Sequence, residues 1–197
     1  MKNKITPGVI TALLLIALFS CKKESTVNRS PNAELSINKH SNASSIFLEI
    51  NHISLKNAIS AGNEDQIASI VNGVANNVAN YFFDKYKIDV KSEFANNPEG
   101  LVLLGLYYAA KEKKSLLNVF HPQGIMTFSN DEDIECFLTA VGTFIGITEA
   151  RNIWKSIVAG ANEEAVITSL ALLNRRITTK TAAGIMVKES GKCLGFW

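Results

Sequence analysis

The chain has 197 residues, enough for one domain or at most two. Its 47% of hydrophobic residues and four prolines exclude a mainly disordered or collagen-like chain, and its formal charge of +2 excludes a strongly basic nucleic-acid binder as the default. Three cysteines and three histidines leave little material for a dense disulfide scaffold or for a zinc site with several histidine ligands.

Residues 1–20 are predicted to be a signal peptide. Lys2 and Lys4 give a positively charged start, and a mostly apolar run of 15 residues, Ile5–Phe19, follows them up to the small residue Ser20. A membrane-spanning helix would need about 20 apolar residues. The run is shorter and is interrupted by polar residues, so we expect it to be removed.

The end of this run, Leu18-Phe19-Ser20-Cys21, resembles the lipobox of bacterial lipoproteins. Phe19 is bulkier than the residue usual at its position. The resemblance implies cleavage after Ser20 and acylation of Cys21 with fatty acids such as palmitate, which would anchor the chain in a lipid membrane. The alternative is an ordinary secretory signal with a chance cysteine.

The residues after Cys21 bear on localisation. Lys22-Lys23-Glu24 is similar to the start of mature lipoproteins of the Bacteroidota. No aspartate follows Cys21, which by the same resemblance implies delivery to the outer membrane. The sequence leaves open whether the protein faces the periplasm or the cell surface.

Residues 21–43 are predicted to be a lipidated flexible tether. Polar residues dominate this segment, so it cannot bury enough apolar surface to offset the entropy lost on ordering. Arg29 is the first arginine of the chain and a candidate processing site, where cleavage would release the rest of the protein. The commoner role of such a residue is a solvated charge in a linker.

Residues 44–130 are predicted to form an acidic helical bundle. Ile46, Ile50 and Ile53 are expected on one helical face. Asn63 is expected to cap a long amphipathic helix. Its inward residues are Ile67, Ile70, Val71, Val74, Val78, Tyr81 and Phe82.

A second helix of this bundle is expected to begin at Asn97-Pro98-Glu99. Leu101–Ala110 is apolar nearly all round and too short to span a bilayer, so it is predicted to be a buried core helix. The lysines of Lys111–Lys114 are expected to end it, because positive charge is favourable at a helix C-terminus. A loop is predicted at 120–130.

Residues 131–197 are predicted to form a basic, glycine-rich apolar helical unit. Asn130 and the acids after it are expected to start a helix that carries Phe137 inward. Further helices are expected from Thr148–Glu149 to Gly160, after Asn162, and over Thr181–Lys188. Strand signals are weak throughout, so the predicted fold class is all-α.

Cys136 and Cys193 are the cysteines that remain if Cys21 is lipidated. In an oxidising envelope they are expected to form a disulfide, although two buried free thiols are the alternative. The closed loop spans 57 positions, for which chain entropy gives about 4 kcal/mol.

No catalytic, metal-binding or cofactor motif is found in the sequence. His40, His52 and His121 belong to no recognised signature, and the acids at 131–135 are better explained by helix capping than by calcium. The sequence therefore predicts no enzyme, no cofactor and no metal. Gly142 and Gly146 form a GxxxG pattern, which permits close helix packing either in a membrane or in a soluble bundle.

The C-terminal segment resembles helical bacteriocin domains and the closing regions of Bacteroidota lipoproteins. The shared pattern is Cys136, a Gly- and Ala-rich apolar stretch, and Cys193 followed by Leu194-Gly195-Phe196-Trp197. Many peptide bacteriocins are much shorter and have no anchored acidic bundle. The resemblance implies an antibacterial lipoprotein that acts on a target-cell membrane, or on a receptor there.

In that case, aromatic residues would enter the membrane interface and basic residues would contact anionic headgroups. The predicted anchors are Phe137, Phe144, Trp154, Phe196 and Trp197, and the predicted headgroup contacts are Arg151, Lys155, Arg175 and Arg176. The alternative is a non-enzymatic binding or structural envelope lipoprotein, in which the same apolar faces are simply core. Nucleic acid is not an expected partner in either case.

Overall fold

The computed structural model describes residues 42–94, 97–120, 129–160, 162–173 and 179–197. Over these residues the chain forms nine α-helices and no strand, so the all-α prediction is confirmed. The predicted signal peptide, Cys21, Arg29 and most of the predicted tether lie outside the described residues. The helices are α2 (Ala43–Leu48), α3 (His52–Ser60), α4 (Glu64–Tyr86), α5 (Val90–Glu93), α6 (Pro98–Phe120), α7 (Ser129–Ile145), α8 (Ile147–Val158), α9 (Glu163–Leu173) and α10 (Lys180–Cys193).

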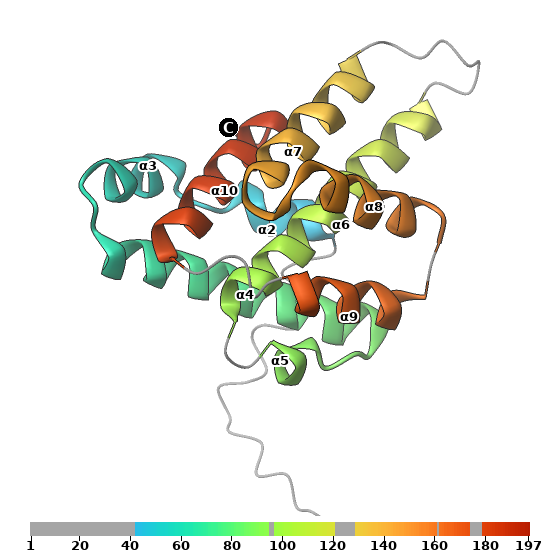
Figure 1. Cartoon of the computed structure of the whole chain (residues 1–197), viewed down its shortest axis with the longest axis horizontal. Coiled ribbons are helices and arrows are strands. Elements are labelled where there is room, and N and C mark those ends of the chain that lie inside the picture. The colour runs from blue at the N-terminus through green and yellow to red at the C-terminus, as the bar shows by residue number, and fades with distance from the viewer. Residues whose placement is uncertain (1–41, 95–96, 121–128, 161, 174–178) are drawn as a thin grey trace, which may run out of the picture. The chain divides into compact units, whose positions relative to one another are not determined.

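Helix α6 lies at the centre of the fold, in contact with α2, α4, α7, α8, α9 and α10 (Figure 1). Every residue from Leu101 to Ala110 is buried, as the all-round apolar pattern predicts. Gly105 allows the close approach of α4, because a Cβ there would lie 2.5 Å from Cγ2 of Val78. The buried decamer is therefore the core around which the other helices pack.

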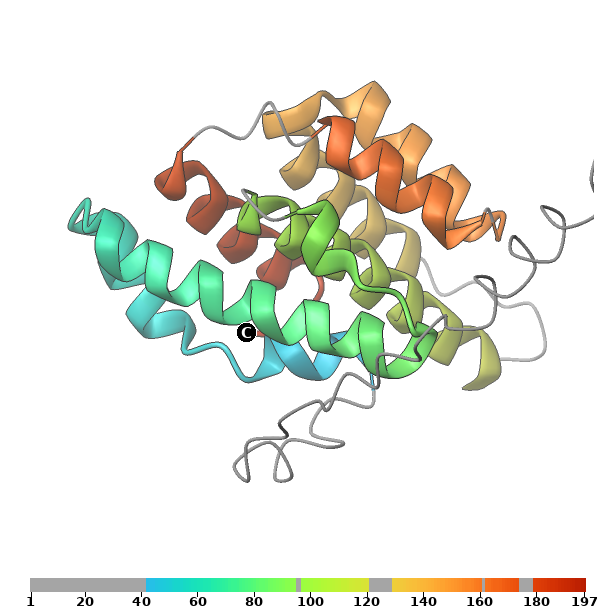
Figure 2. The ribbon, with the colours of Figure 1, turned by 90° about the horizontal axis from the view of Figure 1, so that it is seen from below.

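Helix α4 begins where the sequence predicts. The side chain of Asn63 accepts a hydrogen bond of 3.0 Å from the backbone N–H of Gln66, which satisfies one of the free donors of the first turn. Except for the half-buried Ile70, the residues predicted to face inward are buried. In Figure 2, α4 runs across the front of the molecule.

The predicted common face of Ile46, Ile50 and Ile53 is wrong. Helix α2 ends at Leu48, and Asn51 caps a new helix by accepting a 3.0 Å hydrogen bond from the N–H of Ser54. Ile46 is consequently buried and Ile50 half-buried, whereas Ile53 is 61% exposed. The local cap interrupts the helical register that the spacing of the three isoleucines suggested.

The predicted end of the core helix at Lys111–Lys114 is also wrong, because α6 continues to Phe120. Two of the charged residues there make tertiary contacts. Glu112 accepts hydrogen bonds from α2 and α4, and Lys113 Nζ lies 2.8 Å from a carboxylate oxygen of Asp133. These charges thus hold neighbouring segments rather than terminate a helix.

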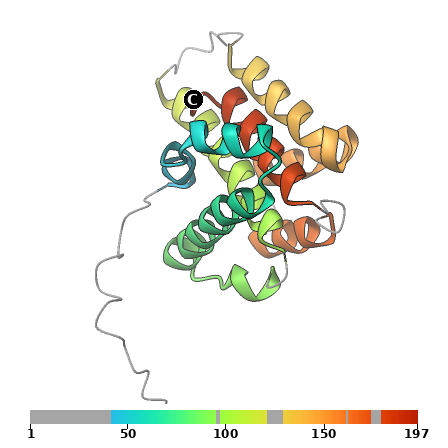
Figure 3. The same cartoon turned by 90° about the vertical axis from the view of Figure 1, so that its left-hand side faces the viewer.

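Helices α7 and α10 lie side by side and are joined by the disulfide Cys136–Cys193, which confirms the predicted pair. The two Cα atoms are 5.5 Å apart. Helix α10 is longer than the predicted Thr181–Lys188 segment, because it continues through Gly191 to Cys193. Figure 3 shows α3 beside α10.

The glycines of the GxxxG pattern lie at the junction of two helices, Gly142 in the last turn of α7 and Gly146 between α7 and α8. Gly146 has φ +96° and is the N-cap of α8, and the position that a Cβ would take at Gly142 lies 2.9 Å from the Cα of Ile147. A side chain at either position would hinder the reversal from α7 to α8. The close packing is therefore between consecutive helices of one chain.

The segments 44–130 and 131–197 contribute to one hydrophobic core. The described residues belong to a single compact unit, and α10 packs against α3, α4 and α6. Buried residues of α10, such as Met186, belong to the same cluster as Ile67 of α4. At the edge of this interface Lys180 of α10 pairs with the mostly buried carboxylate of Glu99 of α6.

Candidate functional site

Two of the residues predicted to contact a membrane belong to the core. Phe137 is fully buried, and its ring meets that of Tyr107 edge to face at 5.2 Å between centroids. Trp154 is 8% exposed, and the ammonium of Lys114 lies 5.8 Å from its ring centroid. In this fold both side chains stabilise the bundle and are not available to a membrane surface.

The other three predicted anchors are half-buried. Phe196 stacks on Phe47 of α2 with 5.8 Å between ring centroids, and Trp197 stacks on His52 of α3 at 5.9 Å. Phe144 packs against the core from α7. The C-terminal aromatic residues therefore tie the end of the chain to the first two described helices.

The last residues are held by further contacts. The indole N–H of Trp197 donates to the carbonyl of Lys188, and the N–H of Phe196 donates to the carbonyl of Gly191. A side chain at Gly191 would overlap the Trp197 ring, which explains a glycine inside α10. Lys113 of α6 also donates a 2.7 Å hydrogen bond to the carbonyl of Leu194.

Two of the four residues predicted to contact lipid headgroups lie in the part of the chain that the structure describes. Arg151 is on the surface and forms an ion pair of 2.8 Å with Glu135 of α7, both side chains being about half exposed. Lys155, one turn further along α8, is exposed. Arg175 and Arg176 lie outside the described residues. Among the described residues, the predicted headgroup contacts are therefore Arg151 and Lys155, both on α8.

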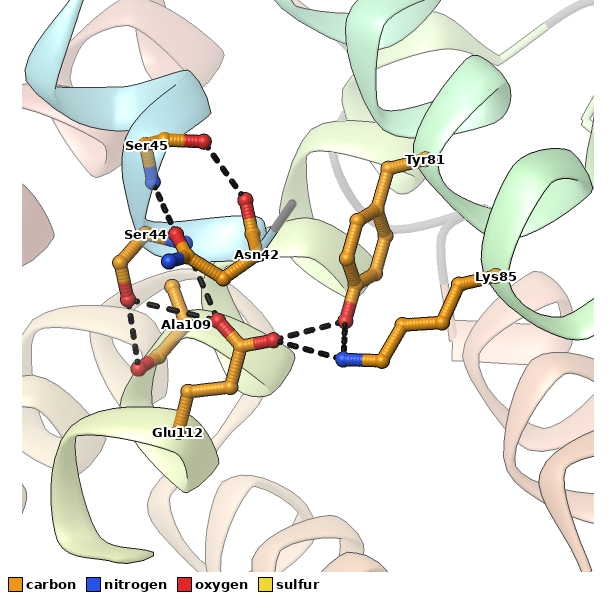
Figure 4. Close-up of polar contacts among 7 residues, drawn as sticks. All are labelled: Asn42, Ser44, Ser45, Tyr81, Lys85, Ala109 and Glu112. Carbon is orange, nitrogen blue, oxygen red and sulfur yellow. Dashed lines mark hydrogen bonds and ion pairs between the residues drawn. The ribbon is translucent and has the colours of Figure 1, made fainter. Parts of the chain in front are cut away.

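A polar cluster joins α2, α4 and α6 (Figure 4). The carboxylate of Glu112 accepts hydrogen bonds from the N–H of Ser44 at 3.2 Å and from the hydroxyl of Tyr81 at 2.8 Å. The ammonium of Lys85 donates to the same carboxylate at 3.2 Å and to the Tyr81 oxygen at 2.9 Å. The cluster fastens α2, the first described helix, to the central helix.

Three tyrosines next to this cluster or within the core have altered acidity. Burial raises the pKa of Tyr81, Tyr107 and Tyr108 above the ordinary value of 10, and the Glu112 carboxylate raises that of Tyr81 further. The hydroxyl of Tyr107 donates a 3.0 Å hydrogen bond to the carbonyl of Ala150. All three phenols are therefore uncharged at neutral pH, and those of Tyr81 and Tyr107 donate hydrogen bonds within the fold.

An open cavity of about 490 Å³ lies between α4, α5 and the start of α6; we call it the α4–α5 cavity. Its rim carries two amides and one ammonium, and its floor is apolar. The lining residues are Asn72, Ala75, Asn76, Lys91, Phe94, Pro98 and Leu101.

This cavity was not among the sites predicted from the sequence. The spacing of Asn72 and Asn76 places both on one helical face, which is a visible signal in the sequence. Their proximity to Lys91 and Phe94, however, depends on how α5 folds back against α4. No local pattern shows that contact.

A second groove, of about 360 Å³, lies between α8 and α9. Ile153 and Val166 are buried beneath it, and Leu172, which lines it, is 63% exposed. Ser156 and Ser169 also line it, but their hydroxyls donate to backbone carbonyls within their own helices. Glu149, Asn152 and Ala165 complete the lining of this groove.

The described ranges contain neither a metal-binding cluster nor a membrane-spanning helix. Within them no three His, Cys, Asp or Glu side chains are grouped so that they could hold a metal ion. None of the helices in these ranges is long and apolar enough to cross a membrane. Comparisons of the chain with protein-family models, curated proteins and solved structures found no match.

Proposed function

We propose that this chain is a lipid-anchored protein of the bacterial cell envelope whose folded unit acts by binding rather than by catalysis. The lipobox-like residues that end in Cys21 support the anchor, and the disulfide fits an oxidising compartment. Of the two functions predicted from the sequence, this is the non-enzymatic binding or structural envelope lipoprotein. The anchor places the folded unit close to a membrane without requiring any helix to enter it.

One observation carries this choice. Phe137 and Trp154, two of the three aromatic anchors predicted on α7 and α8, are core residues. Exposing Phe137 would break its packing against Tyr107 of the central helix. It would also have to occur while Cys193 holds α7 to α10. These contacts support a unit that works in its folded state.

The anchor is tested by replacing Cys21 with serine in cells that export the protein. We expect the unaltered protein in the membrane fraction, labelled by a palmitate analogue, and the Cys21→Ser protein soluble or unprocessed without label, because serine offers no thiol for acylation. The control is Cys136→Ser, which should keep both the label and the membrane location. Label retained by the Cys21→Ser protein would contradict the anchor.

A second candidate is the bacteriocin-like antibacterial lipoprotein, which acts on target-cell membranes through residues 131–197. The observation that favours it is the outer face of α8, where Arg151 and Lys155 accompany the partly exposed Ile147 and Val158. Arginine and lysine are attracted to anionic lipid headgroups, and exposed aliphatic side chains gain free energy by entering the membrane interface. Clearing of any strain when oxidised residues 30–197 are spotted on bacterial lawns would favour this candidate over the first.

A further inference from the structure

We propose that the α4–α5 cavity binds a small polyhydroxylated carboxylate of the uronic-acid class. In this arrangement the ammonium of Lys91 pairs with the carboxylate, and the amides of Asn72 and Asn76 bond the hydroxyls. The inference rests on the proposed binding function and specifies its ligand. It is carried by the free polar groups of the rim, the apolar floor and the charge of the cavity.

The polar groups of the rim are unengaged. Neither the side-chain amides of Asn72 and Asn76 nor the ammonium of Lys91 makes a hydrogen bond or an ion pair with any residue that the structure describes, although Lys91 uses its backbone N–H to bond Asp89. Among the described lysines, Lys85, Lys113 and Lys180 are paired with carboxylates, whereas Lys56 and Lys155 are exposed and unpaired like Lys91. The cavity therefore has donors and acceptors ready for a ligand.

The floor of the cavity is apolar. Ala75, Phe94 and Leu101 are buried and line the cavity, and Pro98 completes it from the first turn of α6. A pyranose ring has C–H groups on its faces and hydroxyls at its edge. A ligand with this division between face and edge fits an apolar floor surrounded by polar groups better than a uniformly polar ion does.

The two amides suit hydroxyl groups. Each amide offers both a donor and an acceptor, and each sugar hydroxyl needs both. Asn72 and Asn76 are four residues apart on α4, which puts their Cβ atoms about 5–6 Å apart, close to the width of one sugar ring. The cavity volume of about 490 Å³ lies within the range of roughly 300–1,000 Å³ typical of small-molecule sites.

The charge of the cavity favours an acidic ligand. Lys91 is the one charged residue among the described residues that line it, and no carboxylate of the described lining opposes it. With a neutral sugar this exposed ammonium would remain hydrated by water. A carboxylate would form a charge-assisted hydrogen bond, which is about twice as strong as a neutral one.

The test is a titration followed by two-dimensional ¹H–¹⁵N NMR on residues 22–197, which contain the whole compact unit. The probes are glucuronate, glucose and acetate. We expect glucuronate to bind with a Kd on the order of 1 mM and to shift amide signals of α4 and α5. Glucose and acetate should each bind at least about tenfold more weakly, because each lacks one half of the recognised chemistry.

Four variants identify the groups involved. Lys91→Gln should weaken glucuronate binding about tenfold and leave glucose binding unchanged, whereas Asn76→Ala should weaken both. The matched controls are Lys56→Gln on α3 and Asn80→Ala on α4, both exposed and outside the cavity. They should bind all three probes like the unaltered protein, and each variant's NMR spectrum reports whether it is folded.

Three results would overturn the inference. They are an absence of shifts with glucuronate at about 50 mM, well above the expected Kd, equal binding of acetate and glucuronate, and Lys91→Gln binding that matches the unaltered protein. The proposed function fails on different measurements: a palmitate label kept by the Cys21→Ser protein, clearing of bacterial lawns, or release of dye from lipid vesicles. The two failures are therefore distinguishable.

Discussion

At the scale of single residues, glycines mark where helices touch most closely. Gly105 of α6 lies against Val78 of α4, whereas a Cβ at Gly73 of α4 would meet no atom within 4 Å. The two positions are therefore a matched pair. Gly105 is required for close packing of the two helices, whereas Gly73 only lowers the stability of α4.

We expect Gly105→Ala to lower the free energy of unfolding by about 1–3 kcal/mol, because the added methyl overfills the α4–α6 contact. Gly73→Ala should raise it by about 0.5–1 kcal/mol, because alanine costs less backbone entropy in a helix. Urea denaturation followed by circular dichroism measures both. If the two substitutions changed stability in the same direction, the described α4–α6 contact would be wrong.

The buried tyrosines predict a dependence on alkaline pH. A phenol whose pKa is raised by folding binds its proton more tightly in the folded state, so its contribution is complete below the unfolded pKa of about 10 and is lost as the pH rises further. We therefore expect the protein to lose stability above about pH 10. Absorbance at 295 nm should show Tyr81, Tyr107 and Tyr108 ionising together with unfolding. Their ionisation near pH 10 in a protein that stays folded would contradict the burial described.

At the scale of elements, most helix starts could be predicted, whereas the ends of α6 and α10 could not. Asn63 and Asn162 cap helices as expected, because a cap is a local contact between a side chain and an N–H two or three residues later. The end of α6 depends instead on partners of Glu112 and Lys113 that are distant in sequence. The extension of α10 through Gly191 similarly depends on the Trp197 ring.

The candidate site follows the same division. The sequence indicates that Asn72 and Asn76 share a face of α4, but only the fold places Lys91 and Phe94 beside them. From the sequence alone, Phe137 and Trp154 fit a role as membrane anchors as well as they fit a role in the core. An apolar helical face has the same spacing in both cases.

Removal of the Cys136–Cys193 disulfide has the largest effect on stability that we expect from any of the proposed substitutions. We expect Cys136→Ser/Cys193→Ser to lower the free energy of unfolding by about 4 kcal/mol, since the bridge closes a loop of 57 positions. Urea denaturation of the variant measures the loss, and the unaltered protein treated with a reductant serves as the control and should lose as much. A loss below about 1 kcal/mol would show that the bridge adds little to α7–α10 packing.

At the scale of the whole molecule, the α7–α10 half cannot be separated from the rest without cost. The central helix α6 contacts helices from both predicted halves, and Phe196 and Trp197 return the C-terminus to α2 and α3. A membrane-active region would have to leave all of these contacts. We therefore propose that the folded unit, rather than a released fragment, is the active form of the protein.

The most direct test of this account is dye release from vesicles of phosphatidylethanolamine and phosphatidylglycerol treated with oxidised residues 22–197. Detergent defines complete release, and Cys136→Ser/Cys193→Ser tests whether opening the bridge matters. We predict that the oxidised protein releases no more dye than buffer does, because Phe137 and Trp154 stay in the core. Release by the oxidised protein would contradict the binding function and favour the membrane-active candidate.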